Sequence, residues 1–305
     1  MINRVTQQTV QRSTLANMQV NLGRMSDLQA RMSSGKVITK PSDDPGGTAK
    51  AMQLRAEKRA TEQFARNADD GLAWLSTIDT ALTSSVSALR NARDLTVRGA
   101  NGGALNAGAR HAIAADIEGV RNSLLAEANS TYLGRSVFAG TSNKGVAYEV
   151  TPAAPPATTT PTYAWTGTAG APVERRLAQD ATVRVDSDGT AVFGTGDQSV
   201  FALLDTIAAG LRAGTDVGGY LTDLDAHLDT MIGGLSSVGT RYNQVTVAQS
   251  GLASSVLELK SQLSAIEDID LAEVIVELQM QEVAYQGALG ATARVLQPTL
   301  MEFLR

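Results

Sequence analysis

Apolar residues recur at helical spacing along most of the chain. The longest run lies between residues 221 and 266, where thirteen of the fourteen a and d positions of seven heptads are apolar. Such a repeat predicts one long coiled-coil helix, roughly 70 Å in length at 1.5 Å per residue. Gly233 and Gly234 are expected to loosen it locally, because a glycine costs about 1 kcal/mol relative to alanine inside a helix.

Shorter periodic segments predict further helices before and after this one. They span roughly residues 4–34, 48–98, 109–133 and 270–296. The a and d seats of the first are Leu15, Met18, Leu22, Met25 and Met32, with Gln29 in the one polar seat. Because this apolar stripe is narrow, the helix is marginal alone and must find a partner. Asp268 or Asp270 is expected to cap the last helix, and Pro298 to end it.

The segment "SSGKVITKPSDDPGG", residues 33–47, interrupts the helical pattern with turn-forming residues. Prolines disfavour helix at the residue before them, and short polar side chains bond nearby backbone amides. These residues are Pro41, Ser42, Asp43, Asp44 and Pro45. Asp44 or Thr48 is expected to cap the helix that follows.

The composition changes between residues 141 and 199, which hold most of the prolines and no helical period. "APPATTTPT", residues 154–162, is typical of a linker or exposed loop. Residues 181–194 alternate apolar and polar side chains around Asp188 and Gly189, which predicts a β-hairpin with its turn at that pair. We therefore expect a small β-rich insert between helices.

The two ends of the chain carry opposite charge. Residues 1–40 hold six basic side chains and one acid, whereas residues 266–305 hold seven acids and two arginines. This asymmetry favours pairing of the ends with each other or with copies of themselves, although two unrelated solvated faces would give the same counts. The net charge of -5 argues against a general nucleic-acid binder.

The sequence offers only weak candidates for catalytic or metal-binding sites. The chain has no cysteine, and its two histidines, His111 and His227, lack further ligands at metal-binding spacing. The sequence "DSDGT" at residues 186–190 lacks the rest of a calcium loop, and a hairpin turn explains it better. Adjacent carboxylates such as Asp43 and Asp44 seldom converge on one substrate. We expect no catalytic residue, no cofactor, no metal, no cleaved leader and no membrane-spanning helix.

These patterns predict a mainly α fold. It is an elongated coiled-coil or helical bundle in which the N- and C-terminal helices pair, with a small β-rich inserted domain. We expect a terminal coiled coil of residues 1–43 with 267–305, a helical rod of 44–140 with 200–266, and the insert 141–199. Such a body offers long lateral surfaces and little concavity, which is typical of a structural building block.

Two motifs carry a resemblance to a known family. "SSGKVITKPSDDPGGTA", residues 33–49, resembles the signature of the bacterial flagellin superfamily, and residues 266–304, which begin "IEDIDLAE", resemble its C-terminal helix. The proline before "SDDP" and the segment "YLGRSVFAGTSNKGVAYEV", residues 132–150, are most similar to the hook-associated protein 3 branch. The chain departs from that branch at residues 144–146.

The resemblance implies a non-enzymatic subunit at the hook–filament junction. It would be secreted through the flagellar export apparatus and act outside the cell as part of the flagellum. The implied partners are hook-associated protein 1, flagellin, copies of the chain in a ring, and a cytoplasmic export chaperone that holds the C-terminal helix. Two alternatives remain open, a flagellin-type filament subunit and an unrelated coiled-coil scaffold or enzyme with its chemistry in residues 141–199.

The terminal helices and the loop between them are the expected interaction site. Incomplete seams of complementary charge are expected to become ordered mainly on assembly, and the loop to act either as a subunit-contacting spoke or as a hinge. The expected assembly residues are Leu15, Met18, Leu22, Met25, Pro41, Ser42, Asp43, Asp44, Pro45, Leu271, Ile275, Leu278, Leu289, Leu296, Leu300, Phe303 and Leu304.

Overall fold

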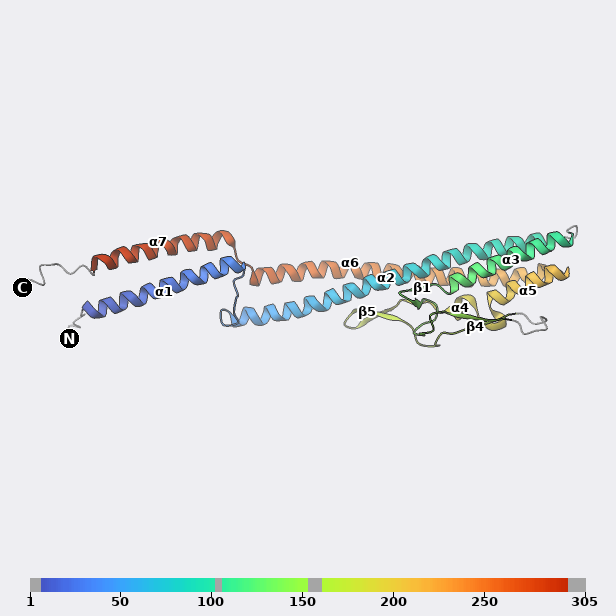
Figure 1. The fold of residues 1–305 in the computed structure, drawn as a ribbon, viewed down its shortest axis with the longest axis horizontal. Helices are drawn as coiled ribbons and strands as arrows, with labels where there is room; N and C mark the ends of the chain where they lie inside the picture. The colour runs from blue at the N-terminus through green and yellow to red at the C-terminus, as the bar shows by residue number, and fades with distance from the viewer. Residues whose placement is uncertain (1–6, 102–105, 153–160, 296–305) are drawn as a thin grey trace, which may run out of the picture. The chain divides into compact units, whose positions relative to one another are not determined.

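The computed structural model describes residues 7–101, 106–152 and 161–295, and these are mainly helical (Figure 1). The α-helices are α1 (Gln7–Ser34), α2 (Pro45–Ala100), α3 (Ala107–Ala128), α4 (Gly189–Phe193), α5 (Val200–Ala213), α6 (Leu221–Glu267) and α7 (Leu271–Val295). The 3-10 helices are η1 (Gly196–Gln198) and η2 (Gly218–Tyr220). The strands are β1 (Thr131–Tyr132), β2 (Arg135–Ser136), β3 (Tyr148–Thr151), β4 (Thr162–Trp165), β5 (Glu174–Ala178) and β6 (Ala181–Arg184).

Consecutive strands pair into three separate antiparallel hairpins, β1 with β2, β3 with β4, and β5 with β6. The predicted mainly helical fold with paired terminal helices and a small β-rich region is confirmed. Within the described ranges, no helix has the length and apolarity that crossing a bilayer requires.

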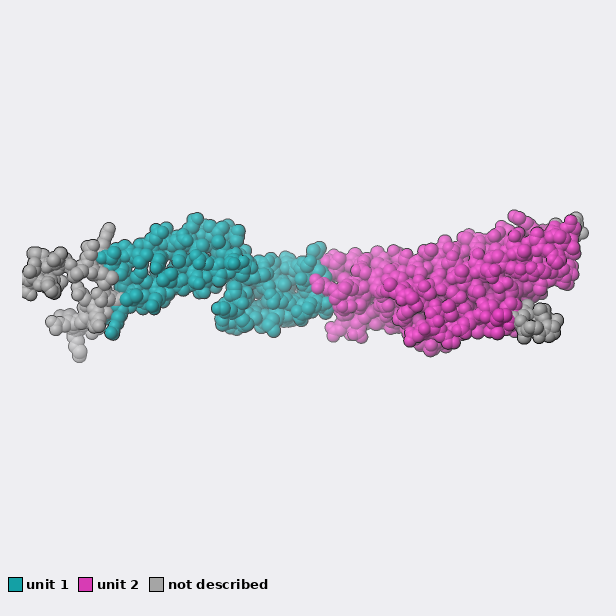
Figure 2. Space-filling model, viewed as in Figure 1, with its two compact units in different colours: residues 1–60, 255–305 teal, residues 61–254 magenta. Residues whose placement is uncertain are grey.

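The chain forms two compact units (Figure 2). Unit 1 holds residues 1–60 and 255–305, and unit 2 holds residues 61–254. The helices α2 and α6 each contribute to both. The three-part division expected from the sequence stays a prediction.

The heptad pattern of α6 places its d positions in the core of unit 2. Leu224, Met231, Val238 and Val245 are fully buried there, and α6 is continuous across the two central glycines. Gly234 allows a close approach, because a Cβ at that position would lie 3.1 Å from Cγ2 of Val192 on α4. This glycine therefore makes room for packing against the insert.

An aromatic cluster joins the insert to the helices of unit 2. The rings of Phe138 and Phe193 meet edge to face at 5.2 Å, and Phe201 at the start of α5 lies 5.1 Å from Tyr148 and 5.2 Å from Tyr163. Edge-to-face and offset contacts of this kind add to the free energy gained by burying the rings. The insert and the helices thus share one hydrophobic core.

The hairpin predicted around Asp188 and Gly189 is wrong. The hairpin lies earlier, in β5 and β6, and Asp188 is the N-cap of α4, where its carboxylate accepts from the Thr190 backbone amide at 2.9 Å. A Cβ at Gly189 would lie 2.7 Å from the carbonyl oxygen of Phe138. An aspartate before glycine suits a turn and a helix start equally, and here tertiary packing selects the helix.

The third helix ends five residues earlier than expected, at Ala128 rather than Leu133. Asn129 ends it, because its side chain accepts from the backbone amides of Ala147 and Tyr148, each at 2.8 Å, and donates to the Tyr148 carbonyl oxygen at 3.1 Å. These bonds attach β3 to the end of α3 and direct the chain into the β1–β2 hairpin.

A buried polar group connects β4 to α3 and α5. The hydroxyl of Tyr163 donates to Asp205 at 2.6 Å, and the Arg121 guanidinium forms an ion pair with the same carboxylate at 3.0 Å. Burial, followed by the hydrogen bond to Asp205, raises the pKa of the Tyr163 hydroxyl, so it remains a donor at neutral pH.

Replacing Tyr163 with phenylalanine is expected to lower the free energy of unfolding of unit 2 by about 1.5–3 kcal/mol, because the buried Asp205 carboxylate loses a hydrogen bond. Urea unfolding of the full chain, followed by near-UV circular dichroism, measures this change. Tyr242→Phe, at a position 40% exposed, is the matched control and should change little. Equal stability of the two variants would contradict the role given to this group.

Candidate interaction surface of the terminal unit

The helices α1 and α7 pack against each other in antiparallel orientation within unit 1. The Gln281 side chain donates to the backbone carbonyl of Asn21 at 3.3 Å, and Thr292 on α7 contacts the sulfur of Met18 on α1. Two helices from opposite ends of the chain thereby form one pair, as Figure 1 shows.

The seam predicted for α1 is partly wrong. Met18 and Met25 are half-buried as expected, but the buried residue among the described side chains of α1 is Leu28, next to the Gln29 seat that the heptad assigned to the seam. Leu15 is 60% exposed and Leu22 is 43% exposed. The pattern misled because α1 carries two overlapping apolar rows, and only the row through Leu28 faces α7.

The helix α7 likewise buries one stripe and exposes others. Val274 is buried and Leu278 is half-buried, whereas Leu271, Ile275 and Leu289 are exposed. Sequence reasoning missed three further exposed apolar residues on α7. They are Val276, Met280 and Val283. The signal that could have revealed them is the run "LAEVIVELQMQEV", which is apolar on more sides than one partner helix can cover.

A short backbone bridge joins the end of α1 to the start of α7. Gly35 ends α1 with a φ of 68°, in the left-handed region that favours glycine. The Val37 amide then donates to the Glu267 carbonyl oxygen at 2.7 Å, and the Ile269 amide to the Gly35 carbonyl oxygen at 3.2 Å. These bonds place Lys36 opposite Asp268 and fix the register of the helix pair.

The two adjacent aspartates of the loop shape the backbone. One carboxylate oxygen of Asp43 accepts from the Thr39 amide, the Thr39 hydroxyl and the Lys40 amide at 2.8–3.1 Å. These bonds, chiefly that from the Thr39 hydroxyl, lower the pKa of Asp43. Asp44 accepts from the Gly47 amide at 2.9 Å and caps α2, whose first residue is Pro45. Of the two predicted caps, Asp44 is therefore correct.

Charged side chains close the bridge. Lys36 lies 2.5 Å from Asp268 and 3.4 Å from Glu267, and Arg55 on α2 lies 2.8 Å from the same Glu267 carboxylate. The hydrogen bond with Asp268 raises the pKa of Lys36, and that from Lys36, with a second from Ser264, lowers the pKa of Asp268. Glu267 is 3% exposed, so the two cations stabilise its burial.

A small pocket of about 240 Å³ lies beside this cluster. The loop residues Thr39, Lys40 and Pro41 line one side, and α2 lines the other. Within the described part of the chain, no group of three or more histidine, aspartate or glutamate side chains is placed to hold a metal ion.

Among the described residues of the two chain ends, the expected pairing of opposite charges is found at the bridge. Among the described residues, Arg24 on α1 and Glu277 and Glu282 on α7 form no ion pair.

Four of the expected assembly residues lie outside the described residues. They are Leu296, Leu300, Phe303 and Leu304. Pro41, Ser42, Asp43, Asp44 and Pro45 are all exposed in the loop. The assembly role given to the whole set stays a prediction.

Comparison with known proteins gives a consistent result. Residues 5–143 match the bacterial flagellin N-terminal helical region. The chain is 25% identical to the flagellar hook-associated protein 3 of Salmonella typhimurium, over 93% of this chain and 94% of that protein. It is also 23% identical to the flagellin of Bacillus subtilis, over 93% of each chain.

A solved structure shares the fold. The flagellar hook-associated protein 3 of Legionella pneumophila superposes with a TM-score of 0.61 and 13% identity, over 70% of this chain and 98% of that one. The resemblance to the flagellin superfamily, and within it to hook-associated protein 3, is confirmed. These similarities support a structural role in the flagellum.

Replacing Leu28 with alanine is expected to weaken the α1–α7 pair by about 2 kcal/mol or more, because it removes the buried leucine of the seam. Leu22→Ala, on the exposed row of the same helix, should change the pairing by less than about 0.5 kcal/mol. Hydrogen exchange of the α1 amides in the purified chain measures both. Similar losses in the two variants would show that the seam is assigned to the wrong row.

The ion pair of the bridge predicts a pH dependence. The pKa of Asp268 is lowered in the folded chain, so its contribution is present above the ordinary carboxyl range and is lost as pH falls below about 4. The pKa of Lys36 is raised, so its contribution persists until strongly alkaline pH. Asp268→Asn should therefore reduce exchange protection of the Val37 and Ile269 amides severalfold at neutral pH.

Lowering the pH should bring the wild-type protection factors toward those of Asp268→Asn. Glu277→Gln, at an exposed position on α7, serves as the control for loss of a negative charge. Unchanged protection of both amides in Asp268→Asn at neutral pH would show that the ion pair contributes nothing to the bridge.

Proposed function

We propose that this chain is a structural subunit of the bacterial flagellum, and that it acts at the hook–filament junction by connecting hook-associated protein 1 to the flagellin filament. The observation that carries the proposal is that α1 and α7 keep apolar residues exposed after they have paired. Leu15 and Leu22 lie on one helix, and Ile275 and Leu289 lie on the other.

Such residues gain free energy when neighbouring copies cover them. Full burial of a leucine or isoleucine side chain contributes about 1.5–3 kcal/mol relative to exposure. A single copy has only one α1 and one α7, so it cannot cover both rows. A ring of copies provides the missing faces, and the terminal unit is then stabilised by mass action as the ring forms.

The choice of the junction rests on the resemblance to hook-associated protein 3. The same resemblance suggests the remaining partners of the proposal. They are copies of the chain in a ring and a cytoplasmic chaperone that holds the C-terminal helix before export. The chain would leave the cell through the flagellar export apparatus and end in the extracellular flagellum. Its role there is mechanical and involves no enzymatic step.

The loop at residues 41–45 has the features of a contacting spoke. Asp43 and Asp44 use their carboxylates within the loop, whereas Pro41 and Ser42 are exposed. A rigid loop with an exposed proline and a hydroxyl presents a fixed surface to a neighbouring subunit. The same rigidity would also suit a hinge between α1 and α2. Substitution of the exposed Ser42 therefore tests the contact with a neighbouring subunit without disturbing the hydrogen bonds of the two aspartates.

A filament-forming flagellin is the alternative, and the full-length similarity to the Bacillus subtilis flagellin favours it. Electron microscopy of the purified chain separates the two, because a flagellin polymerises alone into long filaments. Short rings or monomers would support the junction role, and long filaments would overturn it.

Deletion of the gene is expected to leave hooks without filaments and to release flagellin into the medium. Returning the wild-type chain should restore motility. Returning Leu22→Asp should not, because the new carboxylate would have to be buried without a partner in the assembled array. Electron microscopy of the cells and a flagellin assay of the medium measure these outcomes.

Asn17→Asp adds the same charge at an exposed polar position of α1 and should support motility. Wild-type motility with Leu22→Asp would contradict the interface assignment. Normal filaments in the deletion strain would contradict the junction role itself.

A further inference from the structure

The turn between β1 and β2 contains an unusual residue. Its two central residues are Leu133, with a φ of 49°, and Gly134, with a φ of 77°. A two-residue hairpin turn with both φ values positive favours asparagine, aspartate or glycine at the first position. Leucine there is strained by its Cβ, and no described residue in the chain besides it and the glycines has a positive φ.

The same leucine is also exposed. Its side chain is 80% accessible, the highest value of any large apolar residue in the described chain. An asparagine would relieve the strain and remove the exposed apolar surface together. Strained residues that persist without a local benefit often mark contact sites, which directs attention to what Leu133 touches outside its own chain.

The base of the hairpin is rigid. The Tyr132 ring meets the buried Trp74 ring edge to face at 5.5 Å, and the Arg135 guanidinium lies over Trp74 at 5.7 Å. The Val137 amide donates to the Ser130 carbonyl oxygen at 3.1 Å. Leu133 is therefore held as a fixed apolar knob on the surface of unit 2, next to a positive charge. Among the described residues, Arg135 forms no ion pair.

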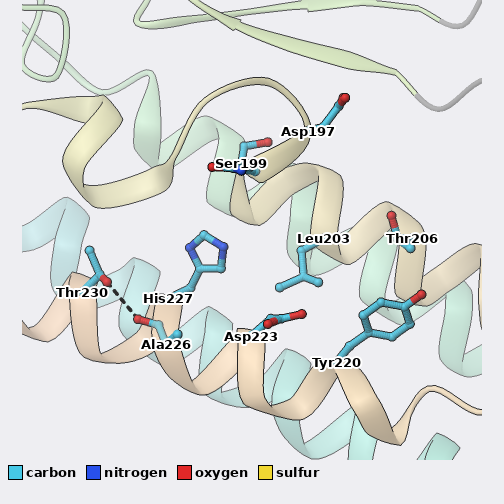
Figure 3. A pocket seen from close by; sticks show the side chains of 10 residues that line it. Asp197, Ser199, Leu203, Thr206, Tyr220, Asp223, Ala226, His227 and Thr230 are labelled. Carbon is cyan, nitrogen blue, oxygen red and sulfur yellow. Dashed lines mark hydrogen bonds between the residues drawn. The ribbon is translucent and has the colours of Figure 1, made fainter.

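Unit 2 also carries a pocket of about 520 Å³ between η1, α5 and the start of α6 (Figure 3). Its lining includes Asp197, Leu203, Tyr220, Asp223, Ala226 and His227. In Figure 3, Leu203 extends from α5 into the space that faces α6. The volume is large enough for the tip of a hairpin and not only for one side chain.

The charge of the pocket is negative. Burial lowers the pKa of His227, and the nearby Asp223 only partly opposes this effect, so the imidazole is neutral at neutral pH. Asp197 and Asp223 form no ion pair with any described residue. Arg135 beside Leu133 is complementary in charge to the unpaired carboxylates of the pocket. Leu203, Tyr220 and Ala226 give its mainly polar lining an apolar part that the leucine can contact.

We infer that the Leu133 turn of one copy docks into this pocket of a second copy. The inference rests on the proposed function for the presence of neighbouring copies. The knob is on the β1–β2 hairpin and the pocket is on other elements of the same unit, so a contact in one direction leaves a free pocket on one copy and a free knob on the other. A head-to-tail contact results, and repetition of such a contact builds rings or helical arrays.

The absence of cysteine from the chain makes a disulfide test specific. Two single variants, Leu133→Cys and Ala226→Cys, are expressed together in cells that lack the native copy, and isolated flagella are oxidised with copper phenanthroline. We expect a disulfide-linked dimer that requires both variants and disappears on reduction. Leu133→Cys with Val247→Cys, an exposed apolar position on α6 outside the pocket, is the matched control and should give at least fivefold less dimer.

A second variant distinguishes loss of the docking contact from loss of folding. Leu133→Asn fits the turn, so the melting temperature of the purified chain should be equal or higher. Its incorporation into flagella, measured with an antibody against the chain, should fall severalfold because the knob is lost. A higher melting temperature with unchanged incorporation would overturn the inference.

The incorporation and cross-linking experiments distinguish failure of the proposed contact from failure of the proposed function. Flagella that contain the chain but show no dimer between positions 133 and 226 would overturn the contact and leave the proposed function intact. Flagella that lack the wild-type chain would overturn the proposed function. In that case the same pair of variants is oxidised in concentrated purified protein, where a dimer supports the contact and its absence overturns it.

Discussion

The antiparallel pairing of α1 with α7 is the constraint on which the terminal unit depends. The bridge that fixes it joins residues 232 positions apart, Lys36 and Asp268, so its ordering opposes the entropy of a long chain. Among the side chains that the structure describes on these two helices, the buried apolar residues are Leu28 and Val274. A pair held by so narrow a stripe gains much from any surface that covers its remaining apolar sides.

The same constraint explains the residues that the pair leaves exposed. A helix that is apolar on several sides needs more than one partner, and one chain supplies only one. The loop residues Asp43 and Asp44 fit this interpretation, since their carboxylates bind backbone amides and hold the exit from α1 and the start of α2 in fixed form. In the proposed function, rigid geometry at this point would present the chain to its neighbours in one orientation.

The sequence predicts long regular helices better than it predicts the local conformation and packing of single residues. The α6 heptads predict the helix correctly, because the apolar pattern of seven repeats outweighs a single polar seat and two glycines. The sequence does not predict which apolar row of α1 faces α7, because Met18 and Met25 belong to both rows. Only the position of α7 in the fold shows that the buried row contains Leu28 and the exposed row contains Leu22. The role of Asp188 is likewise not predictable from the sequence, because its local pattern suits both a hairpin turn and a helix cap. The contact between Gly189 and Phe138 selects the helix cap. The exposed turn at Leu133 could not be predicted, since its backbone angle opposes the residue's own preference.

The two units differ in how their folding relates to assembly. Unit 2 has an interlocked aromatic cluster and a buried Tyr163–Asp205–Arg121 group, so its fold is complete within one chain. Among the described residues of unit 1, the buried apolar side chains are few. They are Leu28, Ala51, Leu54, Leu259 and Val274. Substitutions in the core of unit 2 are therefore expected to act on folding, whereas the proposed function predicts that substitutions on the exposed rows of unit 1 act on association. In the proposed array, unit 2 would already be stable in one copy, and the helix pair of unit 1 would gain further stability from the neighbours that cover its exposed rows.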